Sequence, residues 1–394
     1  MTTIPPLPLP AHIHRKPSIP CPRKGRNHTA PGDAWAEVVM GINTWYNERY
    51  EEIYMQKIHV RKKIVLCVAG VVLLFSCKAK QPSGAGQSAA DMGIGVFIPG
   101  VMAGSAVYEM LAQGVERAGA EKNVAVTVVE AGYNQAEWET ILTSMAASGG
   151  YRLIVSSNPS LPAIATSVSA KFPAQKFLLL DGELAGNGAI YTVRYNQTEQ
   201  AYMAGYIAAL KAREIGATRV GLIAGQEYPA MNSIIVPGYV RGAQAVDPAF
   251  TADFRVLGNW FDAGKAAEIA RDMLANGVKV ILCIAGGANE GIVQTAAENN
   301  AAVVWFDTNG YAVRPGVVVG SAIIRQEKLA YEKTLLFLEG SLPFGRADIV
   351  GVAEGYVDFI EDDPDYKATV SQDIREKQSA LIARIRGGSL VLQE

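Results

Sequence analysis

The sequence is poor in histidine and cysteine, the residues on which most catalytic triads and many metal sites depend. It has 4 of each among 394 residues, and the last histidine is His59. Beyond that position, a Ser-His-Asp or Cys-His nucleophile and an H-E-x-x-H zinc site cannot form. Carboxylate-pair hydrolysis is compatible with the composition but has no positive sign. We therefore expect no enzyme, no catalytic residue, no metal site and no cofactor.

Two further function classes lack their signatures. The glycine-rich segments 93–95 and 286–291 do not match a dinucleotide-binding fingerprint, and no GxxxxGK[ST] phosphate loop occurs. The chain carries 36 Lys and Arg against 38 Asp and Glu, and 10 of the basic but only 5 of the acidic residues precede Cys77. The remainder is mildly acidic, with a formal charge of about −7. Such a surface does not favour nucleic acid as a partner.

Residues 57–77 have the layout of a bacterial signal peptide. A basic cluster is followed by an apolar run of 12 residues at 64–75, then by Ser76 and Cys77. A membrane-spanning helix needs roughly 20 residues, so this run is too short to be a permanent span. A small residue directly before cysteine resembles the lipobox of bacterial lipoproteins, although Phe75 is bulkier than the usual residue at its position. The competing interpretation, a buried core segment, fits the flanking basic cluster poorly.

This interpretation predicts the organisation of the N-terminal part. Residues 1–54 are rich in proline and lack a sustained apolar period, so we expect a disordered or untranslated leader. Residues 55–76 would be the signal peptide, Cys77 the acylated (palmitate-bearing) first residue of the mature protein, and 77–90 a flexible tether. The predicted location is the periplasmic face of the bacterial inner membrane, with a lipid anchor.

From Met92 onward, short apolar strands alternate with amphipathic helices, which is typical of α/β folds with parallel sheets. The pattern occurs twice. GYRLIVS at 150–156 corresponds to GVKVILC at 277–283, and FLLLD ending at Asp181 corresponds to VVWFD ending at Asp307. We predict two similar Rossmann-like α/β lobes that face each other. Lobe 1 is expected at 91–193 plus about 322–345, and lobe 2 at 194–321 plus about 346–394.

A ligand site is expected where loops leave the carboxyl ends of the strands, because open parallel sheets bind ligands there. These loops are rich in Asn, Asp, Tyr and Trp, which fix hydroxyl groups and stack on flat rings. The predicted ligand-binding residues are Asp307, Asn309, Tyr311, Trp260, Tyr228, Asn232, Asn158, Asp181 and Tyr133. Each also has a structural interpretation: asparagines are typical turn residues, and aromatic residues often belong to the core.

The chain resembles the basic membrane protein (BMP) family of ABC-importer substrate-binding lipoproteins. The motifs are YNQTEQAYMAG at 195–205, GLIAG at 221–225, PGYVRG at 237–242, AGGANEG at 285–291 and FDTN at 306–309. The resemblance covers residue 92 to the C-terminus. It implies a type I periplasmic-binding-protein fold, in which two lobes joined by a hinge close on a small-molecule ligand. It also implies permease and ATPase subunits as partners, and a monomeric receptor.

Within the family, purine nucleoside receptors and a spirochaetal riboflavin-binding branch are the relevant comparisons. Asp307 matches the aspartate that contacts ribose, but the corresponding lysine would fall near Ile324 and is missing, and the loop at 99–105 lacks the acidic Phe-Asn pattern. Because these ribose contacts are lost, we expect riboflavin, with its larger ring and open polyol, as the transported ligand. A purine nucleoside receptor is the alternative within the family. A hydrolase or transferase and a surface antigen are the alternatives from other classes.

Overall fold

The structure, a computed structural model, describes residues 92–393. The predicted leader, signal peptide and tether and the predicted lipidation site Cys77 lie outside the described residues. The first lobe contains β1 (Gly93–Ile98), α2 (Ala106–Glu121), β2 (Val126–Glu130), α3 (Gln135–Ala147), β3 (Tyr151–Ser157), α4 (Leu161–Lys171), β4 (Lys176–Leu180), β5 (Ile190–Tyr195), α9 (Gln326–Leu338) and β11 (Ala347–Val350).

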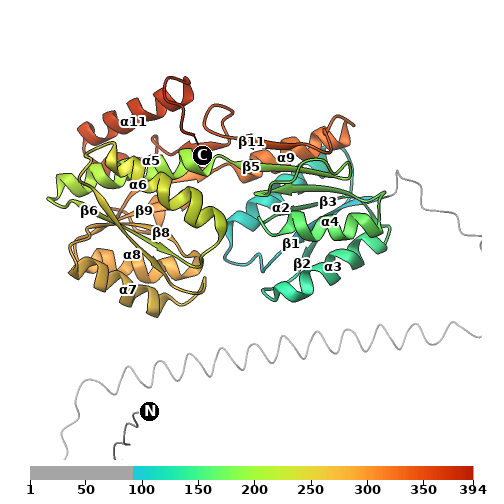
Figure 1. The fold of residues 1–394 in the computed structure, drawn as a ribbon, viewed down its shortest axis with the longest axis horizontal. Coiled ribbons are helices and arrows are strands. Elements are labelled where there is room, and N and C mark those ends of the chain that lie inside the picture. The colour runs from blue at the N-terminus through green and yellow to red at the C-terminus, as the bar shows by residue number, and fades with distance from the viewer. Residues whose placement is uncertain (1–91, 394) are drawn as a thin grey trace, which may run out of the picture. The chain divides into compact units, whose positions relative to one another are not determined.

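The second lobe follows the same order of elements with additions at its end (Figure 1). It contains α5 (Gln197–Glu214), β6 (Arg219–Ala224), η1 (Met231–Ile235), α6 (Val236–Gln244), β7 (Thr251–Val256), α7 (Ala263–Ala275), β8 (Val280–Ile284), η2 (Gly286–Ala288), α8 (Asn289–Glu298), β9 (Ala302–Asp307), η3 (Tyr311–Val313), β10 (Val318–Ile324), β12 (Val357–Phe359), α10 (Pro364–Thr369) and α11 (Gln372–Arg386).

Each lobe is built on one six-stranded sheet. The strand orders are β11-β5-β4-β3-β1-β2 and β12-β10-β9-β8-β6-β7. The two orders match strand by strand, so that β1 in the first sheet corresponds to β6 in the second. All pairs in the first sheet are parallel. In the second sheet only β12 is antiparallel, to β10. The prediction of two α/β lobes with predominantly parallel sheets is confirmed.

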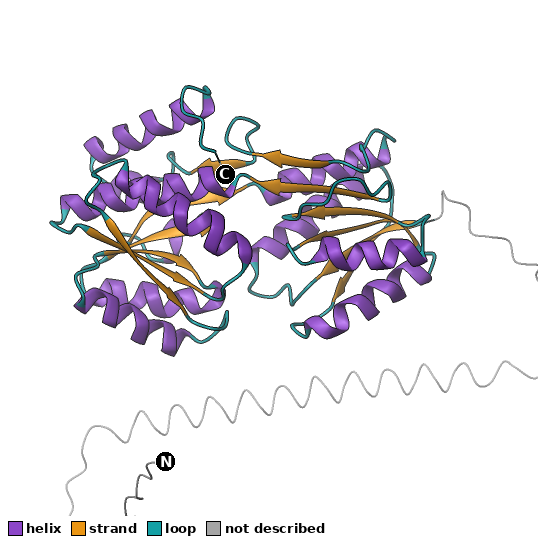
Figure 2. Cartoon of the chain, viewed as in Figure 1, coloured by secondary structure: helices purple, strands orange, loops and turns teal. Residues whose placement is uncertain are grey.

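Alternation of side chains across each sheet explains why both faces are covered by helices (Figure 2). In β1, Ile94, Val96 and Ile98 belong to one hydrophobic core, and Phe97 points into another. The core that contains Phe97 also contains buried residues of α3 and α4, such as Trp138. The other face packs toward α2 and α9, which contact each other. Burial on both faces therefore positions the strand ends rigidly.

The chain passes between the lobes three times. It leaves the first sheet after β5 and enters α5, which packs on α6; it leaves the second sheet after β10 and enters α9, which packs on α2. The third passage runs from β11 to β12. These three segments connect the lobes and would form the predicted hinge. One boundary differs: the second lobe was predicted to resume at about 346, but β11 pairs with β5, because its backbone completes the edge of the first sheet.

Helix boundaries follow local capping. Asn196 accepts a hydrogen bond from the Glu199 amide at 3.1 Å, and Asp262 accepts one from the Lys265 amide at 2.9 Å, so each side chain caps the helix that follows it. The reciprocal contact expected of a capping box is replaced, because Glu199 Oε2 accepts from the Val352 amide at 2.8 Å in the hinge. The helix expected near 234–245 begins earlier, as the π-helix η1 followed by α6.

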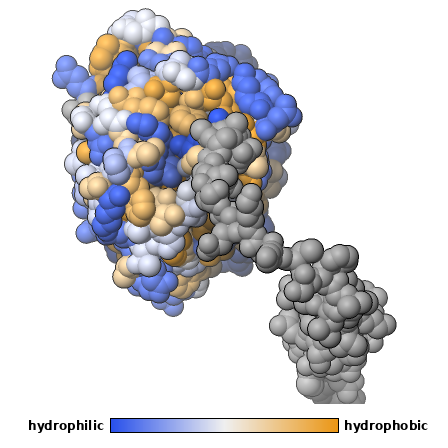
Figure 3. All heavy atoms as spheres, turned by 90° about the vertical axis from the view of Figure 1, so that its right-hand side faces the viewer, coloured by the Kyte–Doolittle hydropathy of each residue, from blue (hydrophilic) through white to orange (hydrophobic). Residues whose placement is uncertain are grey.

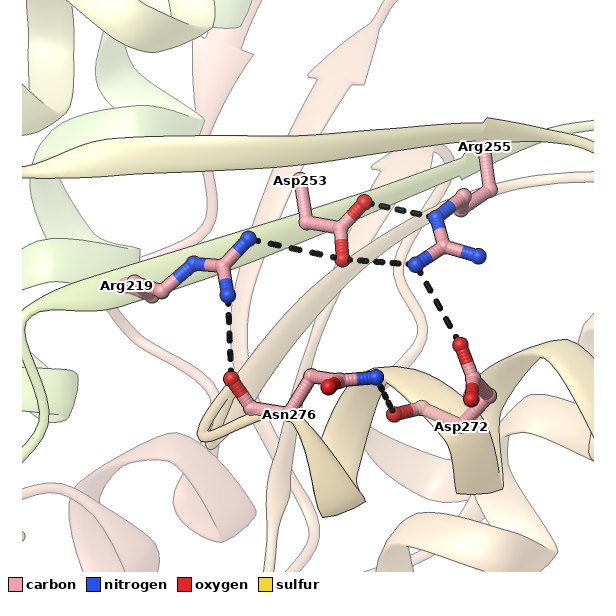
Figure 4. A network of polar contacts seen from close by, with 5 residues as sticks. All are labelled: Arg219, Asp253, Arg255, Asp272 and Asn276. Atoms are coloured by element: carbon pink, nitrogen blue, oxygen red, sulfur yellow. Dashed lines mark hydrogen bonds and ion pairs between the residues drawn. The ribbon is translucent and has the colours of Figure 1, made fainter.

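The edge strand β7 carries a charged network on the second lobe (Figure 4). Arg255 donates from Nε to Asp253 Oδ1 at 2.7 Å and approaches Asp272 of α7 at 3.2 Å. Arg219 donates to the Asn276 carbonyl at 3.0 Å. Exposed ion pairs stabilise a fold by only about 0–1 kcal/mol each. Charged side chains on an edge strand have a second effect, because they discourage the unpaired edge from pairing with a strand of another molecule.

The exposed surface is mixed in polarity. On the side of the first lobe seen in Figure 3, apolar and polar residues alternate without one dominating. Over the described part of the chain, the large apolar side chains that are exposed are Tyr133, Ile215, Phe261, Val313, Ile349 and Val391. Among residues 92–393, no helix combines the length and the hydrophobicity needed to cross a membrane.

Candidate ligand-binding site

Two aspartates occupy matching positions at the carboxyl ends of β4 and β9. Asp181 follows β4 directly, and Asp307 is the last residue of β9. Both have a positive φ, 54° and 69° respectively, in the left-handed region that non-glycine residues seldom adopt. Such conformations cost of order 1–3 kcal/mol and are concentrated at functional sites. The shared backbone geometry shows that the internal repeat extends to the residues that end these strands.

The two carboxyl groups influence each other across the lobes. Burial raises the pKa of Asp181 from 3.8 to about 7, the negative charge of Asp307 adds to this effect, and Arg194 opposes it. Burial also raises the pKa of Asp307 from 3.8 to about 6, and a hydrogen bond from Gln200 opposes that rise. The charge of Asp307, on the second lobe, therefore acts on Asp181 at the strand end of the first. Near neutral pH, the pair carries less than two full negative charges.

Phenol groups surround this carboxyl pair. Tyr108, on α2, has its pKa raised to about 12, first by burial and then by the charge of Asp181, while a hydrogen bond with Asn158 opposes the rise. Burial and then the charges of Asp307 and Asp181 raise the pKa of Tyr228. Both phenols are therefore neutral hydrogen-bond donors and acceptors at physiological pH. Four predicted site residues, Asn158, Asp181, Tyr228 and Asp307, take part in these electrostatic interactions and come from both lobes.

Tyr133 lies beside this group on the first lobe. Its ring is 71% exposed, and its Cε1 would be 3.7 Å from a Cβ atom placed on Gly100. The Tyr108 ring lies on the same glycine, at 3.0 Å. Gly100 has a φ of 158° and leaves room for both rings at the end of β1. Tyr133 is therefore an accessible aromatic residue at the rim of the site.

Trp260 packs where three loops of the second lobe converge. A Cβ atom on Gly225, after β6, would lie 2.4 Å from Trp260 Cε3, and one on Gly286, after β8, would lie 3.1 Å from the Trp260 carbonyl oxygen. The Ala288 amide donates to that oxygen at 3.2 Å. The indole is half-buried, so part of it is accessible at the sheet edge. Close contact with glycine is what places this ring.

Asn232 is exposed on η1, one turn after Tyr228. Its backbone amide donates to the Tyr228 carbonyl at 3.2 Å. π-helical turns are rare and are found frequently at functional sites. Asn232 therefore lies one turn from Tyr228, on the second lobe.

Two predicted contacts have structural roles. Tyr311 is fully buried; its hydroxyl donates to the Ile360 carbonyl at 2.9 Å and accepts from the Ser321 amide at 3.1 Å. Asn309 accepts from the Tyr311 amide at 3.1 Å and donates to Asp363 Oδ2 at 2.9 Å. Tyr311 is a core residue and Asn309 stabilises the loop, so these contacts account for both side chains, and their role as ligand contacts stays a prediction. Asn309 and Tyr311 follow the end of β9 within a few residues, and the short helix η3 directs the Tyr311 ring into the core.

Sequence reasoning missed Tyr108 and Gln200. Tyr108 lies in the first turns of α2, and its sequence neighbours are typical of an ordinary surface helix. Gln200 lies on α5, fully buried, and its Nε2 donates to Asp307 Oδ1 at 3.0 Å across 107 residues of sequence. A glutamine on the apolar face of a helix could have been noticed, because buried amides require partners.

Solved structures share this two-lobed architecture. A solute-binding protein of an ABC transporter system from Aeropyrum pernix K1 superimposes with a TM-score of 0.66 at 21% identity, covering 77% of this chain and 94% of that one. A carbohydrate transporter solute-binding protein from Agrobacterium radiobacter, in complex with D-arabinose, gives 0.57 at 16% identity, covering 75% and 100%. The fold is that of type I periplasmic solute-binding proteins.

The family assignment is more specific. Residues 92–389 match the family described as ABC transporter substrate-binding protein PnrA-like (Bmp). The chain belongs to this family, as the sequence motifs predicted.

Curated relatives agree with this assignment. A nucleoside-binding protein of an ABC transporter from Lactococcus lactis subsp. cremoris is 25% identical over 262 residues, 62% of this chain and 73% of the relative. A purine-binding protein from Brucella abortus is 31% identical over 137 residues, 34% and 37% of the two chains. An uncharacterized lipoprotein from Pyrococcus abyssi is 26% identical over 199 residues, 49% and 48%.

Proposed function

We propose that this chain is the receptor of an ABC importer that binds a flat, hydroxylated heterocycle between its lobes, with riboflavin as the first candidate. The observation that carries the proposal is the meeting of Asp181 and Asp307 among the phenols of Tyr108 and Tyr228. Carboxylates accept hydrogen bonds from hydroxyl groups, and the Trp260 indole offers a face for stacking. The ligand is carried and not converted, so no catalytic residue and no resident cofactor is proposed.

Binding to both lobes would also drive closure. A hydrogen bond to a charged group contributes about 1.5–3 kcal/mol, so contacts to both aspartates contribute about 3–6 kcal/mol. Moving a two-state equilibrium from 1:99 to 99:1 requires about 5.5 kcal/mol of differential affinity. A ligand that touches both carboxyl groups can therefore shift the lobes toward the closed form, whereas one that touches a single lobe cannot.

A purine nucleoside is the second candidate ligand. The Lactococcus relative is a nucleoside-binding protein and the Brucella relative a purine-binding protein, which favours this ligand class. Ribose hydroxyls could use Asp307 as readily as a ribityl chain could. The two ligands differ in ring size and in the number of hydroxyl groups, so competition between them is measurable.

The proposed setting is the outer face of a bacterial inner membrane. Cys77 would carry the lipid anchor, and the permease and ATPase subunits of an importer would receive the ligand from a monomeric receptor. The Pyrococcus relative is named a lipoprotein, which supports this setting.

The test uses purified protein comprising residues 77–394, with Asp307→Asn as the matched variant. Under the proposal, riboflavin raises the Tm, its visible absorbance co-purifies, and the variant loses both effects. Stabilisation by inosine or adenosine but not by riboflavin would select the nucleoside. Chemical conversion of the bound ligand, followed by mass spectrometry, would instead establish a hydrolase or transferase. Failure of every such compound to bind would leave the surface-antigen function.

A further inference from the structure

Gln200 contacts the site from inside the second lobe. The chain has just crossed the hinge when α5 begins, and Gln200 lies in its first turn with no exposed surface. Its Nε2 donates to Asp307 Oδ1 at 3.0 Å and to the Ala322 carbonyl of β10 at 3.1 Å. A fully buried amide thus contacts one of the two site carboxylates directly.

The orientation of this amide is determined by its neighbours. Nε2 faces two acceptors, so the reversed amide would place Oε1 against both of them. Within the described residues, Oε1 has no hydrogen-bond partner in the observed orientation. A buried acceptor without a partner destabilises the fold. What distinguishes Gln200 is therefore not this acceptor but the contact of its Nε2 with Asp307 and with the Ala322 carbonyl.

Asp181 has no equivalent support. Its backbone amide donates to the Val193 carbonyl at 2.9 Å, but among residues 92–393 no side chain donates a hydrogen bond to its carboxyl group. The first lobe also has a buried glutamine near the start of its crossing helix, Gln326, which is the first residue of α9, whereas Gln200 is the fourth residue of α5. Gln326 accepts from the Tyr195 hydroxyl at 3.0 Å and donates to the Val107 carbonyl at 2.9 Å, and so does not bind Asp181.

We propose that Gln200 is a positioning residue that determines specificity, because its amide holds Asp307 as a fixed acceptor for ligand hydroxyl groups. This inference rests on the proposed function. The electrostatics agree with the geometry, since the hydrogen bond from Gln200 opposes the rise that burial causes in the pKa of Asp307. The pKa of Asp181 is set by its burial, by the charge of Asp307 and by Arg194, and the charge of Asp181 in turn raises the pKa of the phenols of Tyr108, Tyr195 and Tyr228.

The binding test compares Gln200→Met with a matched control, Gln378→Met. Gln378 is also fully buried in the second lobe, donates to the Met203 carbonyl at 3.3 Å and has an unpartnered Oε1 among the described residues, but does not touch Asp307. The probes are riboflavin and lumiflavin, which has the same ring without the ribityl hydroxyls. We expect Gln200→Met to weaken riboflavin binding about tenfold or more and to change lumiflavin binding less than about twofold, while the control changes neither.

A pH series separates positioning from packing. In the wild type, riboflavin affinity should change with pH between about 6 and 8, as Asp181 titrates, and Gln200→Met should alter this profile because Asp307 then titrates in the same range. Equal weakening of both flavins, or a profile identical to that of the wild type, would overturn the proposal.

A ligand-free measurement keeps this inference distinct from the proposed function. In wild-type protein, the side-chain amide NMR signals of Gln200 should shift with the ionisation of Asp307, and those of Gln378 should not. This requires neither a variant nor a bound flavin. If no flavin or nucleoside binds but the Gln200 signal titrates, the proposed ligand is wrong and the positioning role stands. If the Gln200 signal does not titrate, the positioning role is refuted even when riboflavin binds.

Discussion

Replacing Asp181 by asparagine should stabilise the ligand-free protein at pH 8 and not at pH 4. The carboxyl group has an ordinary pKa of 3.8 and a folded-state pKa of about 7, raised chiefly by burial. The folded state therefore binds the proton more tightly than the unfolded state. The stability that the protonated Asp181 contributes is therefore fully present below about pH 4 and is lost as the pH rises through 7.

The size of the effect follows from the same shift. One pKa unit corresponds to 1.36 kcal/mol, so the full shift corresponds to about 4 kcal/mol. Asp181 is only partly buried by exposed area, so solvent reduces this figure, and we expect about 2–4 kcal/mol at pH 8. Asparagine keeps the shape and carries no charge, which removes both the burial penalty and the repulsion from Asp307. The gain should come with weaker ligand binding, as is common for active or binding sites.

The assay is thermal and urea unfolding of residues 77–394 at pH 4, 6 and 8, with Asp362→Asn as the control. Asp362 is exposed in the loop before α10, so its replacement should leave stability within about 0.5 kcal/mol at each pH. The variant should exceed the wild type in Tm by several degrees at pH 8, by less at pH 6 and by nothing at pH 4. A variant that is less stable at pH 8, or a difference independent of pH, would refute the reasoning.

Three further predictions concern other parts of the chain. Gly225→Ala should displace the Trp260 ring, because the new Cβ would lie 2.4 Å from its Cε3. We expect changed tryptophan fluorescence and a free energy of unfolding lower by about 1–3 kcal/mol. The control Gly188→Ala should change neither, because no atom lies within 4 Å of the new Cβ. Cys77→Ser should move the protein from the membrane to the released fraction of cells and abolish labelling with palmitate; persistence in the membrane would contradict the lipid anchor. Tyr311→Phe should cost about 1–3 kcal/mol of stability in urea unfolding without weakening ligand binding, because it leaves two buried backbone groups unpaired; a selective loss of affinity would restore Tyr311 as a ligand contact.

Much of the fold could be predicted because its signals are local. Short apolar runs bounded by polar residues specify buried parallel strands, and the expected alternation of such runs with helices after Met92 matches the observed order of elements. Less regular regions were placed less well. The start of α6 was missed because η1 precedes it, and β11 was expected in the second lobe because an edge strand of four residues carries little periodic signal.

The candidate site likewise has a part that the sequence predicts and a part that only the structure shows. Asp181 and Asp307 could be found from the sequence, because the repeat ends the same strand with the same residue. Their interaction could not, since it depends on two lobes coming together. Tyr311 was predicted as a ligand contact because it follows a strand end, but η3 turns its ring into the core.

The sequence by itself therefore determined two similar α/β lobes, the strand ends that would line a site and the family to which the chain belongs, because hydrophobic periodicity and motif order are properties of consecutive residues. Only the tertiary structure decided which polar groups meet. Gln200 reaches Asp307 across 107 residues because the chain crosses the hinge and returns α5 beneath β9 and β10. Contacts between residues so far apart in sequence depend on how the helices and sheets pack, and no local sequence pattern predicts them.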